Sequence, residues 1–430
     1  MNAEAGQHWT QRPVSRRAAL GGVGAAATSI ALAACSGSSG GATTIRFYQT
    51  KPEVVTYFDK LITQYHRAQT KVRVVHDSTS SVAAQFVRGN VPDLALLNYN
   101  LDTARYVARG VLTDLSDVPA AATIQPGVQA LVNQYATWKG QTSVLPYSIT
   151  ACGVIYNKAL FAKAGVTPPT TFAELLQVCK KLKAKGITPF YATYKDPWTI
   201  RQGFFDYSVG GSLPDVARFY KQLDKEGAAV GPSSSVSFSK TLAGPIDKML
   251  QLTQFSNPDA PSKSYPDGNL NFAQSKAAMY LQGPWALGEI ALTSKRISIG
   301  QFPLPMTEDP ADRKVRVNLD LAAWIPQGSG NKAAARDFLN WLMQPSIINR
   351  YNADNLAYGV TKTAPAPTDR RISDLAPYVS ASKFYQGATT YLPNAIPADG
   401  LVQSLVLTRQ PGPVLSTLDS DWNRLQQRSA

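Results

Sequence analysis

Tryptophan rings and planar polar side chains occur at turns of this sequence where they can contact a ligand. Trp285 follows a Gly-Pro pair, which fixes a turn and presents the indole at the start of a helix. Asp196 and Trp198 lie on a loop after an apparent strand at 189–193. Rings of this kind pack on the C–H faces of a carbohydrate, and carboxylate or amide groups bond its hydroxyls. A core tryptophan, a capping aspartate and a surface aromatic ring are the structural alternatives for these residues.

Five further candidates directly follow two predicted strands. They are Gln49 and Lys51 after the strand at 44–48, and Asn98, Tyr99 and Asn100 after the apolar strand at 93–97. Open α/β sheets bind ligands beyond the carboxyl ends of their strands, so we expect these side chains to face a ligand. Asn-rich segments also form plain turns, which is the alternative interpretation for this group.

The sequence offers few groups for catalysis or metal binding. Outside the Ser/Gly-rich run at 36–41 no Gly-x-Ser-x-Gly motif occurs, and the three histidines, His8, His66 and His76, all lie near the start of the chain. No Cys-x-x-Cys pair or Cys/His cluster is present, so we expect neither a metal nor a cofactor. We therefore expect a binding protein and not an enzyme. A glycosidase with paired carboxylates stays open as an alternative, because acidic residues are plentiful.

The first 34 residues have the features of an export signal. Arg12, Arg16 and Arg17 give a positive start, and residues 18–34 are uncharged and rich in Ala and Gly. This stretch is too short and too weakly apolar for a good membrane span. The run at 15–20 resembles a twin-arginine signal, with the general export route as the alternative.

The end of this signal resembles a bacterial lipobox. A Leu-Ala-Ala-Cys run ends at Cys35, and a Ser/Gly-rich tether fills 35–43. The resemblance implies that Cys35 carries a lipid that holds the protein at the outer face of the cell membrane. A soluble secretory signal with a chance cysteine is the alternative. In an exported chain, Cys152 and Cys179 fit a disulfide or two buried thiols equally well.

The composition is typical of a globular chain with room for two domains. Of the 430 residues, 44% are hydrophobic and 17% are charged. A net charge of +14 is also common among nucleic-acid-binding proteins. Here, however, the lysines and arginines are scattered, and the densest group, at 180–185, fits the solvated face of one helix. We therefore expect no nucleic-acid partner.

Hydrophobic periodicity predicts an α/β chain in which strands alternate with helices. The predicted strands lie at 44–48, 72–75, 93–97, 153–156, 189–193, 297–301 and 315–325. The predicted helices lie at 54–68, 81–88, 157–165, 171–185, 331–343 and 415–427, with a mostly helical stretch over 214–281. Thr171 and Glu174 form a capping box at the start of one of them.

Four segments match a known family in their order and spacing over nearly the whole chain. They are Pro-Asp-Leu-Ala-Leu-Leu at 92–97, Leu-Pro-Tyr at 145–147 with the strand at 153–158, the segment 272–285 that ends in Gly-Pro-Trp, and the helix at 332–342. The chain thus resembles the bacterial extracellular solute-binding proteins of the sugar-binding type (family 1, maltose-binding-protein-like), which serve ABC transporters.

The resemblance implies a type II periplasmic-binding-protein fold, in which two α/β lobes joined by hinge crossings enclose the ligand between them. We expect the first lobe at 44–148 plus 322–374, and the second at 152–318 plus 377–430. Closure by hinge bending needs no catalysis. The partners it implies are a small solute and the transmembrane permease subunits of an ABC importer, and we expect the protein to be a monomer.

The resemblance also assigns roles to single residues. Trp285 matches the tryptophan on which family members stack a sugar, and Asp196 with Trp198 matches a place where they supply a carboxylate and a ring. Thr150 falls where a sugar binder has a carboxylate. Asp320 and Trp324, which flank the second crossing, either line the cleft or pack in the hinge.

Departures from the family pattern argue against maltose as the ligand. Leu97 and Asn100 stand where maltose binders have a tryptophan and an aspartate, and Leu and Val at 401–402 replace late aromatic residues. We expect a monosaccharide, an oligosaccharide or an amino sugar. A non-sugar such as a glycerophosphodiester or a polyamine is the alternative, and for the phosphodiester Lys51 or Arg201 would face the phosphate.

Overall fold

The structure is a computed structural model that describes residues 41–429. The chain divides into two units, residues 1–41 and 42–430, and the fold is that of the second unit. The predicted signal peptide over 1–34, the lipidated Cys35 and most of the tether over 35–43 lie outside the described residues. Export and anchoring therefore stay predictions.

The larger sheet contains six strands. They are β1 (Thr43–Tyr48), β2 (Val72–Asp77), β3 (Leu94–Leu97), β4 (Leu145–Cys152), β9 (Val315–Trp324) and β10 (Phe384–Gln386). Their order is β10-β9-β3-β1-β2, with β4 also paired to β9. β1 pairs in parallel with β2 and β3, whereas β9 runs antiparallel to β3 and β4. The strands predicted at 44–48, 72–75 and 93–97 are confirmed.

The smaller sheet contains four strands in the order β6-β7-β5-β8. They are β5 (Val154–Asn157), β6 (Thr188–Tyr191), β7 (Ala277–Tyr280) and β8 (Ile299–Phe302). β6 and β7 are parallel, and β5 is antiparallel to both of its neighbours. The two sheets are the centres of the two lobes, which confirms the predicted fold class. The residue limits predicted for the lobes stay a prediction.

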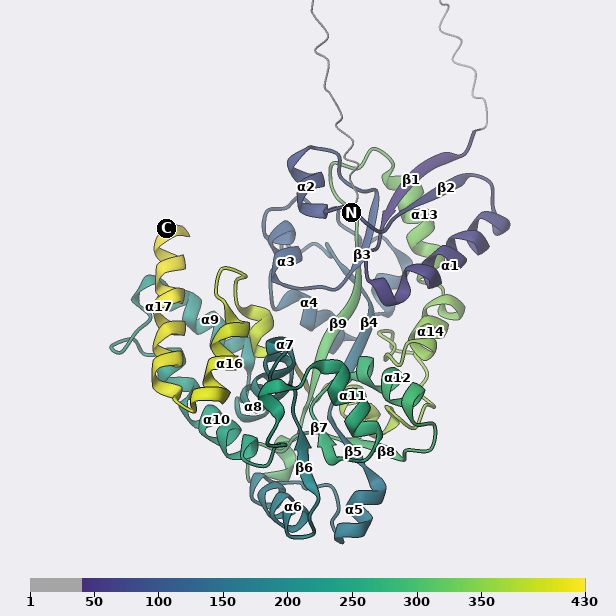
Figure 1. Ribbon diagram of the computed structural model, residues 1–430. Helices are drawn as coiled ribbons and strands as arrows, with labels where there is room; N and C mark the ends of the chain where they lie inside the picture. Colours follow the sequence, from purple (N-terminus) through teal and green to yellow (C-terminus); the bar gives the residue numbers. More distant parts are fainter. Residues whose placement is uncertain (1–40, 430) are drawn as a thin grey trace, which may run out of the picture. The chain divides into compact units, whose positions relative to one another are not determined.

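Six helices flank the larger sheet. They are α1 (Val55–Ala68), α2 (Val82–Val87), α3 (Leu101–Ala108), α4 (Pro126–Asn133), α13 (Lys332–Leu342) and α14 (Pro345–Asp354). The apolar stripe of α1 is buried at Phe58, Leu61, Ile62 and Tyr65, as the helical spacing predicted. Figure 1 shows α1 and α13 beside β1 and β2, and α1 packs on β2 while α13 packs on β1.

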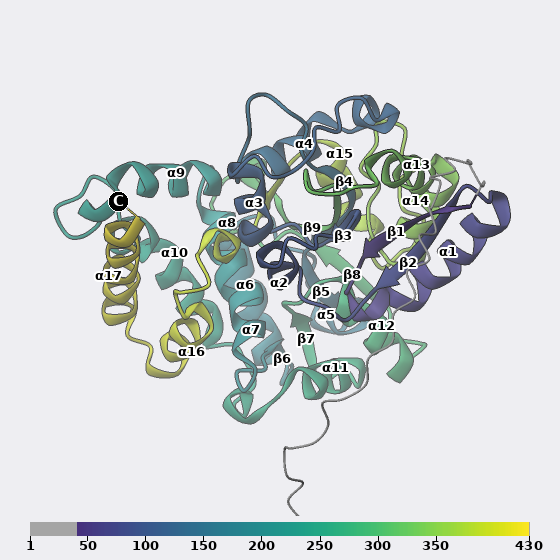
Figure 2. The same cartoon turned by 90° about the horizontal axis from the view of Figure 1, so that it is seen from above.

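The remaining α-helices follow the first crossing of the chain. They are α5 (Lys158–Ala164), α6 (Phe172–Ala184), α7 (Pro197–Ile200), α8 (Asp206–Ser212), α9 (Val216–Glu226), α10 (Phe238–Thr253), α11 (Tyr265–Ala273), α12 (Pro284–Thr293), α15 (Ala376–Ser380), α16 (Ala398–Thr408) and α17 (Pro411–Ser429). Figure 2 shows α9, α10, α16 and α17 gathered on one side of the sheets. The hydroxyl of Thr171 caps α6 by accepting from the backbone N–H of Glu174, and the Glu174 carboxylate accepts from the backbone N–H and the hydroxyl of Thr170, one residue before the predicted cap.

Two long antiparallel strands, β4 and β9, carry the chain from one sheet to the other. Gly153 alone separates β4 from β5, and a Cβ at Gly153 would lie 2.8 Å from the carbonyl oxygen of Phe302. β9 follows β8 of the smaller sheet along the chain and pairs with β3 and β4 of the larger one, so it joins the two lobes. Within residues 41–429, no helix combines the length and the apolar character needed to cross a membrane.

Candidate ligand-binding cleft

A cleft of about 1010 Å³ opens between the lobes. One wall carries residues that follow β1 and β3, together with the end of α14, and the other carries residues from α7, α11 and α12. The middle of β9 contributes Asn318 and Asp320 to the same lining. The volume is that of a site for a small organic ligand. Among the predicted site residues, the lining includes Lys51, Asn98, Trp198, Trp285 and Asp320.

Trp285 is the first of the two indoles in the cleft, and it lies at the N-terminus of α12. Gly283 is the N-cap residue and Pro284 occupies the first helical turn, where its fixed φ is compatible with the helix. The ring is half-buried, and its N–H donates to the side-chain oxygen of Gln282 at 3.2 Å. A Cβ at Gly283 would lie 2.2 Å from the indole, so only glycine leaves room for this ring.

Trp198 and Tyr265 form a second aromatic surface of the cleft. Their ring centroids are 4.9 Å apart with an interplanar angle of 57°. Asp196 holds the pair together, because its carboxylate accepts a hydrogen bond from the backbone N–H of Tyr265 at 2.6 Å while it stands at the N-cap of α7. Asp196 itself does not line the cleft. The structure thus gives it contacts that position two rings.

The polar floor of the cleft is centred on Asp320. Its carboxylate pairs with the ammonium group of Lys51 at 2.6 Å and accepts a hydrogen bond from the Ser148 hydroxyl at 3.2 Å. The side-chain amide of Asn98 donates to the backbone carbonyl of Asp320 at 2.7 Å. Contacts from the segments that follow β1 and β3, and from β4 itself, therefore converge on one residue of β9. A ligand here meets amide and carboxylate groups on one side and aromatic rings on the other.

The remaining predicted site residues lie beside the cleft and do not line it. They are Gln49, Tyr99, Asn100, Thr150 and Trp324. Asn100 caps α3 through Thr103, and Trp324 packs against the rings of Phe86 and Tyr106. The other three are buried, and their side-chain polar atoms have no hydrogen-bond partner among the described residues. Burial raises the pKa of the Tyr99 hydroxyl. Their roles stay predictions.

Several residues that line the cleft were not predicted from the sequence. They are Glu53, Gln202, Tyr265, Glu289, Asn318 and Asp354. Of these, only Asn318 could have been predicted from the sequence, because it lies two residues before Asp320 on the same strand and therefore on the same face. Burial raises the pKa of the Tyr265 hydroxyl, and the carboxylates of Glu289 and Glu53 raise it further.

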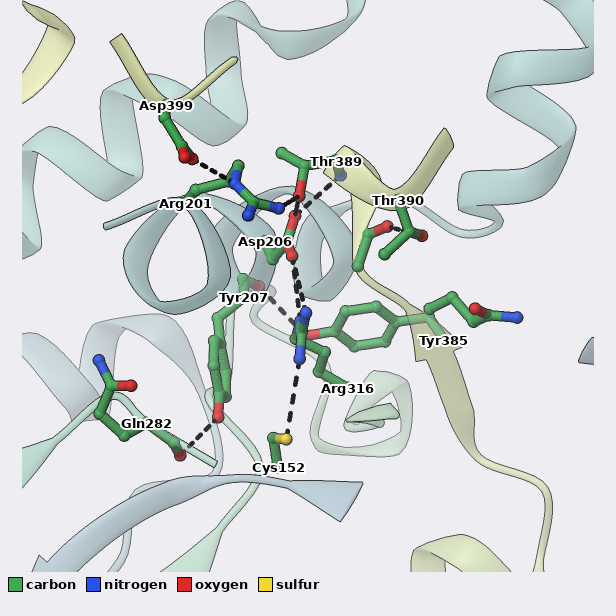
Figure 3. Close-up of polar contacts among 12 residues, drawn as sticks. Cys152, Arg201, Asp206, Tyr207, Gln282, Arg316, Tyr385, Thr389, Thr390 and Asp399 are labelled. Carbon is green, nitrogen blue, oxygen red and sulfur yellow. Dashed lines mark hydrogen bonds and ion pairs between the residues drawn. The ribbon is translucent and has the colours of Figure 1, made fainter. Parts of the chain in front are cut away.

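Arg201, the second cation considered for a phosphate ligand, is engaged elsewhere. It pairs with Asp399 on α16 and donates to the Thr389 hydroxyl at 3.3 Å (Figure 3). Thr389 in turn donates from its backbone N–H and its hydroxyl to Asp206, at 2.9 Å each. Among the described residues, Lys51 is the only cationic side chain that lines the cleft, and it is already paired.

Behind the cleft, Asp206 on α8 forms a fully buried ion pair with Arg316 on β9, with both contacts at 3.1 Å. Burial acts to lower the pKa of Arg316, but the negative charge of Asp206 and neighbouring groups outweigh it, and the net pKa lies above the usual value. Figure 3 also shows Arg316 beside the thiol of Cys152, at 3.8 Å. The pair ties a crossing strand to the second lobe.

The cysteines and acidic groups give no sign of redox or metal chemistry in the described part of the chain. Cys152 and Cys179 are buried and unbridged, which answers the open question of a disulfide. Burial raises the pKa of the Cys179 thiol to about 12, so it stays protonated at neutral pH. Within residues 41–429, no group of three or more potential metal ligands comes together.

Comparison with known families identifies the class of protein. The family model for bacterial extracellular solute-binding proteins matches residues 49–347, and the chain belongs to this family. The Multiple sugar-binding protein of Streptococcus mutans is 27% identical over 342 residues, which cover 75% of this chain and 78% of that protein. Diacetylchitobiose binding protein NgcE of Streptomyces coelicolor is 24% identical over 330 residues, covering 73% and 68%.

Solved structures show the same fold. The apo form of RafE from Streptococcus pneumoniae superposes with a TM-score of 0.77 at 19% identity, covering 90% of this chain and 98% of that one. A chitin oligosaccharide binding protein superposes with a TM-score of 0.70 at 17% identity, covering 90% and 99%. At such identities the likeness establishes the two-lobe fold and does not identify the ligand.

Proposed function

We propose that this chain is the lipid-anchored substrate-binding component of an ABC importer and that it binds a carbohydrate in the cleft between its lobes. The observation that carries the proposal is the pairing of aromatic rings with a polar floor. Trp285 and Trp198 offer faces for the C–H surfaces of a sugar ring, and Asn98, Asn318 and Asp320 offer amide and carboxylate groups for its hydroxyls.

The names of relatives support a carbohydrate as the ligand. They include a multiple sugar-binding protein, a melibiose/raffinose/stachyose-binding protein and a diacetylchitobiose binding protein. The relatives are binding proteins, which supports a role in capture without catalysis. Capture closes the lobes because the ligand binds the closed state more tightly than the open one. The closed protein then delivers its ligand to the permease.

A glycerophosphodiester fits the cleft less well. A phosphate buried without a cation is costly. Arg201 does not line the cleft, and Lys51 already pairs with Asp320 at 2.6 Å. A neutral carbohydrate can therefore bind with the Lys51–Asp320 ion pair intact, whereas a phosphodiester would require the charges of the cleft to rearrange.

A thermal-shift screen of monosaccharides, oligosaccharides, amino sugars and glycerophosphodiesters tests the proposal. A ligand that binds the folded protein stabilises it by mass action, by about 2.7 kcal/mol at a concentration one hundred times its Kd. We expect at least one saccharide to raise the melting temperature and the phosphodiesters to leave it unchanged. If no saccharide raises the melting temperature, the proposal is contradicted.

The Trp285→Ala variant tests the site. It should weaken binding of the saccharide found in the screen while the melting temperature of the free protein changes little, because the ring is half-buried. Trp138→Ala removes another partly exposed indole, one that does not line the cleft, and is the matched control. Equal affinity of Trp285→Ala and the unmodified protein in calorimetry contradicts the site.

Anchoring is tested separately in the producing cell. With Cys35→Ser the thiol that would carry the lipid is missing, so we expect the protein to move from the membrane fraction to the soluble exported fraction. Retention of the variant at the membrane contradicts the lipobox assignment. Neither result bears on the ligand.

A further inference from the structure

The cleft is acidic although the protein as a whole is basic. The formal net charge of the chain is +14. Of the residues that the structure describes, four with carboxylates nevertheless line the cleft, against one with a cationic side chain, Lys51. They are Glu53, Glu289, Asp320 and Asp354. A cleft lined by one sign of charge focuses the field within it, so this surplus acts on whatever ligand enters.

Two of these carboxylates already have a cationic partner. Asp320 pairs with Lys51 at 2.6 Å, and Asp354 pairs with Arg350 at 3.4 Å. The carboxylates of Glu53 and Glu289 accept no hydrogen bond from any other described residue and form no ion pair with one. The unbalanced charge of the cleft therefore comes from these two glutamates.

Glu53 and Glu289 stand on opposite walls. Glu53 lies in the 3₁₀ turn η1 (Pro52–Val54) that follows β1, and Glu289 lies on α12, one turn after Trp285. Both glutamates line the same cleft as the aromatic side chains of Trp198, Tyr265 and Trp285. Both carboxylates also act to raise the pKa of the Tyr265 hydroxyl, as negative charges near that ring would.

We propose that the ligand is a saccharide that carries a protonated amine, held between the carboxylates of Glu53 and Glu289 and against the aromatic rings. This inference rests on the proposed carbohydrate function. An ammonium group is attracted by the faces of Trp and Tyr rings, and a carboxylate gives it a charge-assisted hydrogen bond. The hydroxyls of the same ligand would bond the amides of Asn98 and Asn318.

The test compares sugars that share one skeleton and differ in one group. Cellobiose, diacetylchitobiose and the β-1,4-linked glucosamine disaccharide carry a hydroxyl, an acetamide and an ammonium group at C2. Glucose, N-acetylglucosamine and glucosamine form the same series at the size of one ring. We expect calorimetry at neutral pH to give the ammonium member of a series about tenfold or higher affinity than its hydroxyl member, as for a hydrogen bond to a charged group.

Charge variants of the protein assign the effect to the two glutamates. Glu53→Gln and Glu289→Gln should each reduce the advantage of the ammonium sugar several-fold and leave the neutral sugar almost unaffected, since only the charge is lost. Added salt should reduce the same advantage. Asp247→Asn removes one negative charge from an exposed position of α10, outside the cleft, and should change neither affinity.

Each result has a definite meaning. If neutral or acetylated sugars bind as tightly as the ammonium sugars or more tightly, this inference is overturned and the carbohydrate function stands. If spermidine binds and no saccharide does, both are overturned in favour of a polyamine. If ammonium sugars do not bind at all, the inference is likewise overturned, and binding of the neutral series then decides the proposed function.

Discussion

The indole N–H of Trp285 donates a hydrogen bond to the side-chain oxygen of Gln282, 3.2 Å away. The backbone carbonyl of Gln282 accepts a second hydrogen bond, from the buried hydroxyl of Tyr207 at 3.1 Å (Figure 3). The carbonyl of Tyr207 in turn accepts from the hydroxyl of Tyr385 at 3.4 Å. The ring at the ligand cleft is thus connected to the buried interior beneath it, which holds the indole in one orientation before a ligand arrives.

The orientation of this ring predicts the effect of Gly283→Ala. The backbone at Gly283 is extended (φ −96°, ψ −174°), so alanine causes no backbone strain, but its Cβ would lie 2.2 Å from the indole. We expect the ring to shift and saccharide affinity to fall by about three- to tenfold, the worth of an aromatic stacking contact. Calorimetry measures the change. Gly244→Ala, on α10 where a Cβ meets nothing within 4 Å, is the control, and equal affinities for the two variants would refute the steric argument.

The Lys51–Asp320 pair predicts the effect of Lys51→Met. The side chain of Asp320 is 9% exposed and would lose its cationic partner, leaving the Ser148 hydroxyl as its remaining donor. We expect the free energy of unfolding in urea to fall by about 1–3 kcal/mol, less than for a fully buried pair because Lys51 is partly exposed. The double variant Lys51→Met/Asp320→Asn should recover part of the loss. A double variant no more stable than the single one contradicts this account.

The buried Asp206–Arg316 pair predicts a larger loss for Asp206→Asn. Both side chains are almost fully buried, so the variant leaves the Arg316 guanidinium without a counter-charge. We expect a decrease of about 3–5 kcal/mol in the free energy of unfolding. Replacing both residues, as Asp206→Leu with Arg316→Met, should cost less than the single change. Urea denaturation measures both, and a single-variant loss below about 1 kcal/mol would be too small for an uncompensated buried charge.

The start of α11 predicts a pH dependence of stability. The carboxylate of Asp267 accepts from the hydroxyl and the backbone N–H of Ser264, at 2.7 and 2.8 Å, and these bonds lower its pKa below the usual 3.8. Its contribution is therefore full above pH 3.8 and is lost as the pH falls through the lowered pKa. Melting temperatures should show Asp267→Asn less stable than the unmodified protein at neutral pH, with the gap closing in acid. A gap independent of pH would show that the carboxylate charge does not matter.

Local patterns of the sequence determined the elements and part of the site. The period of 3.6 residues predicted α1, and the apolar run at 93–97 predicted β3, because burial of one face depends on spacing alone. The Gly-Pro-Trp turn predicted that Trp285 would be presented at a helix start. The rule that ligands lie beyond strand ends predicted Lys51 and Asn98, and both line the cleft.

The tertiary structure alone decided which neighbours of those residues reach the cleft. Consecutive residues of an extended chain point to opposite sides, so Asn98 lines the cleft while Tyr99 is buried and Asn100 caps a helix. Glu53, Tyr265 and Glu289 come from three elements far apart in the sequence, and no local pattern relates them. Packing of the two lobes along β9 brings them together, and with them the charge that the cleft presents to its ligand.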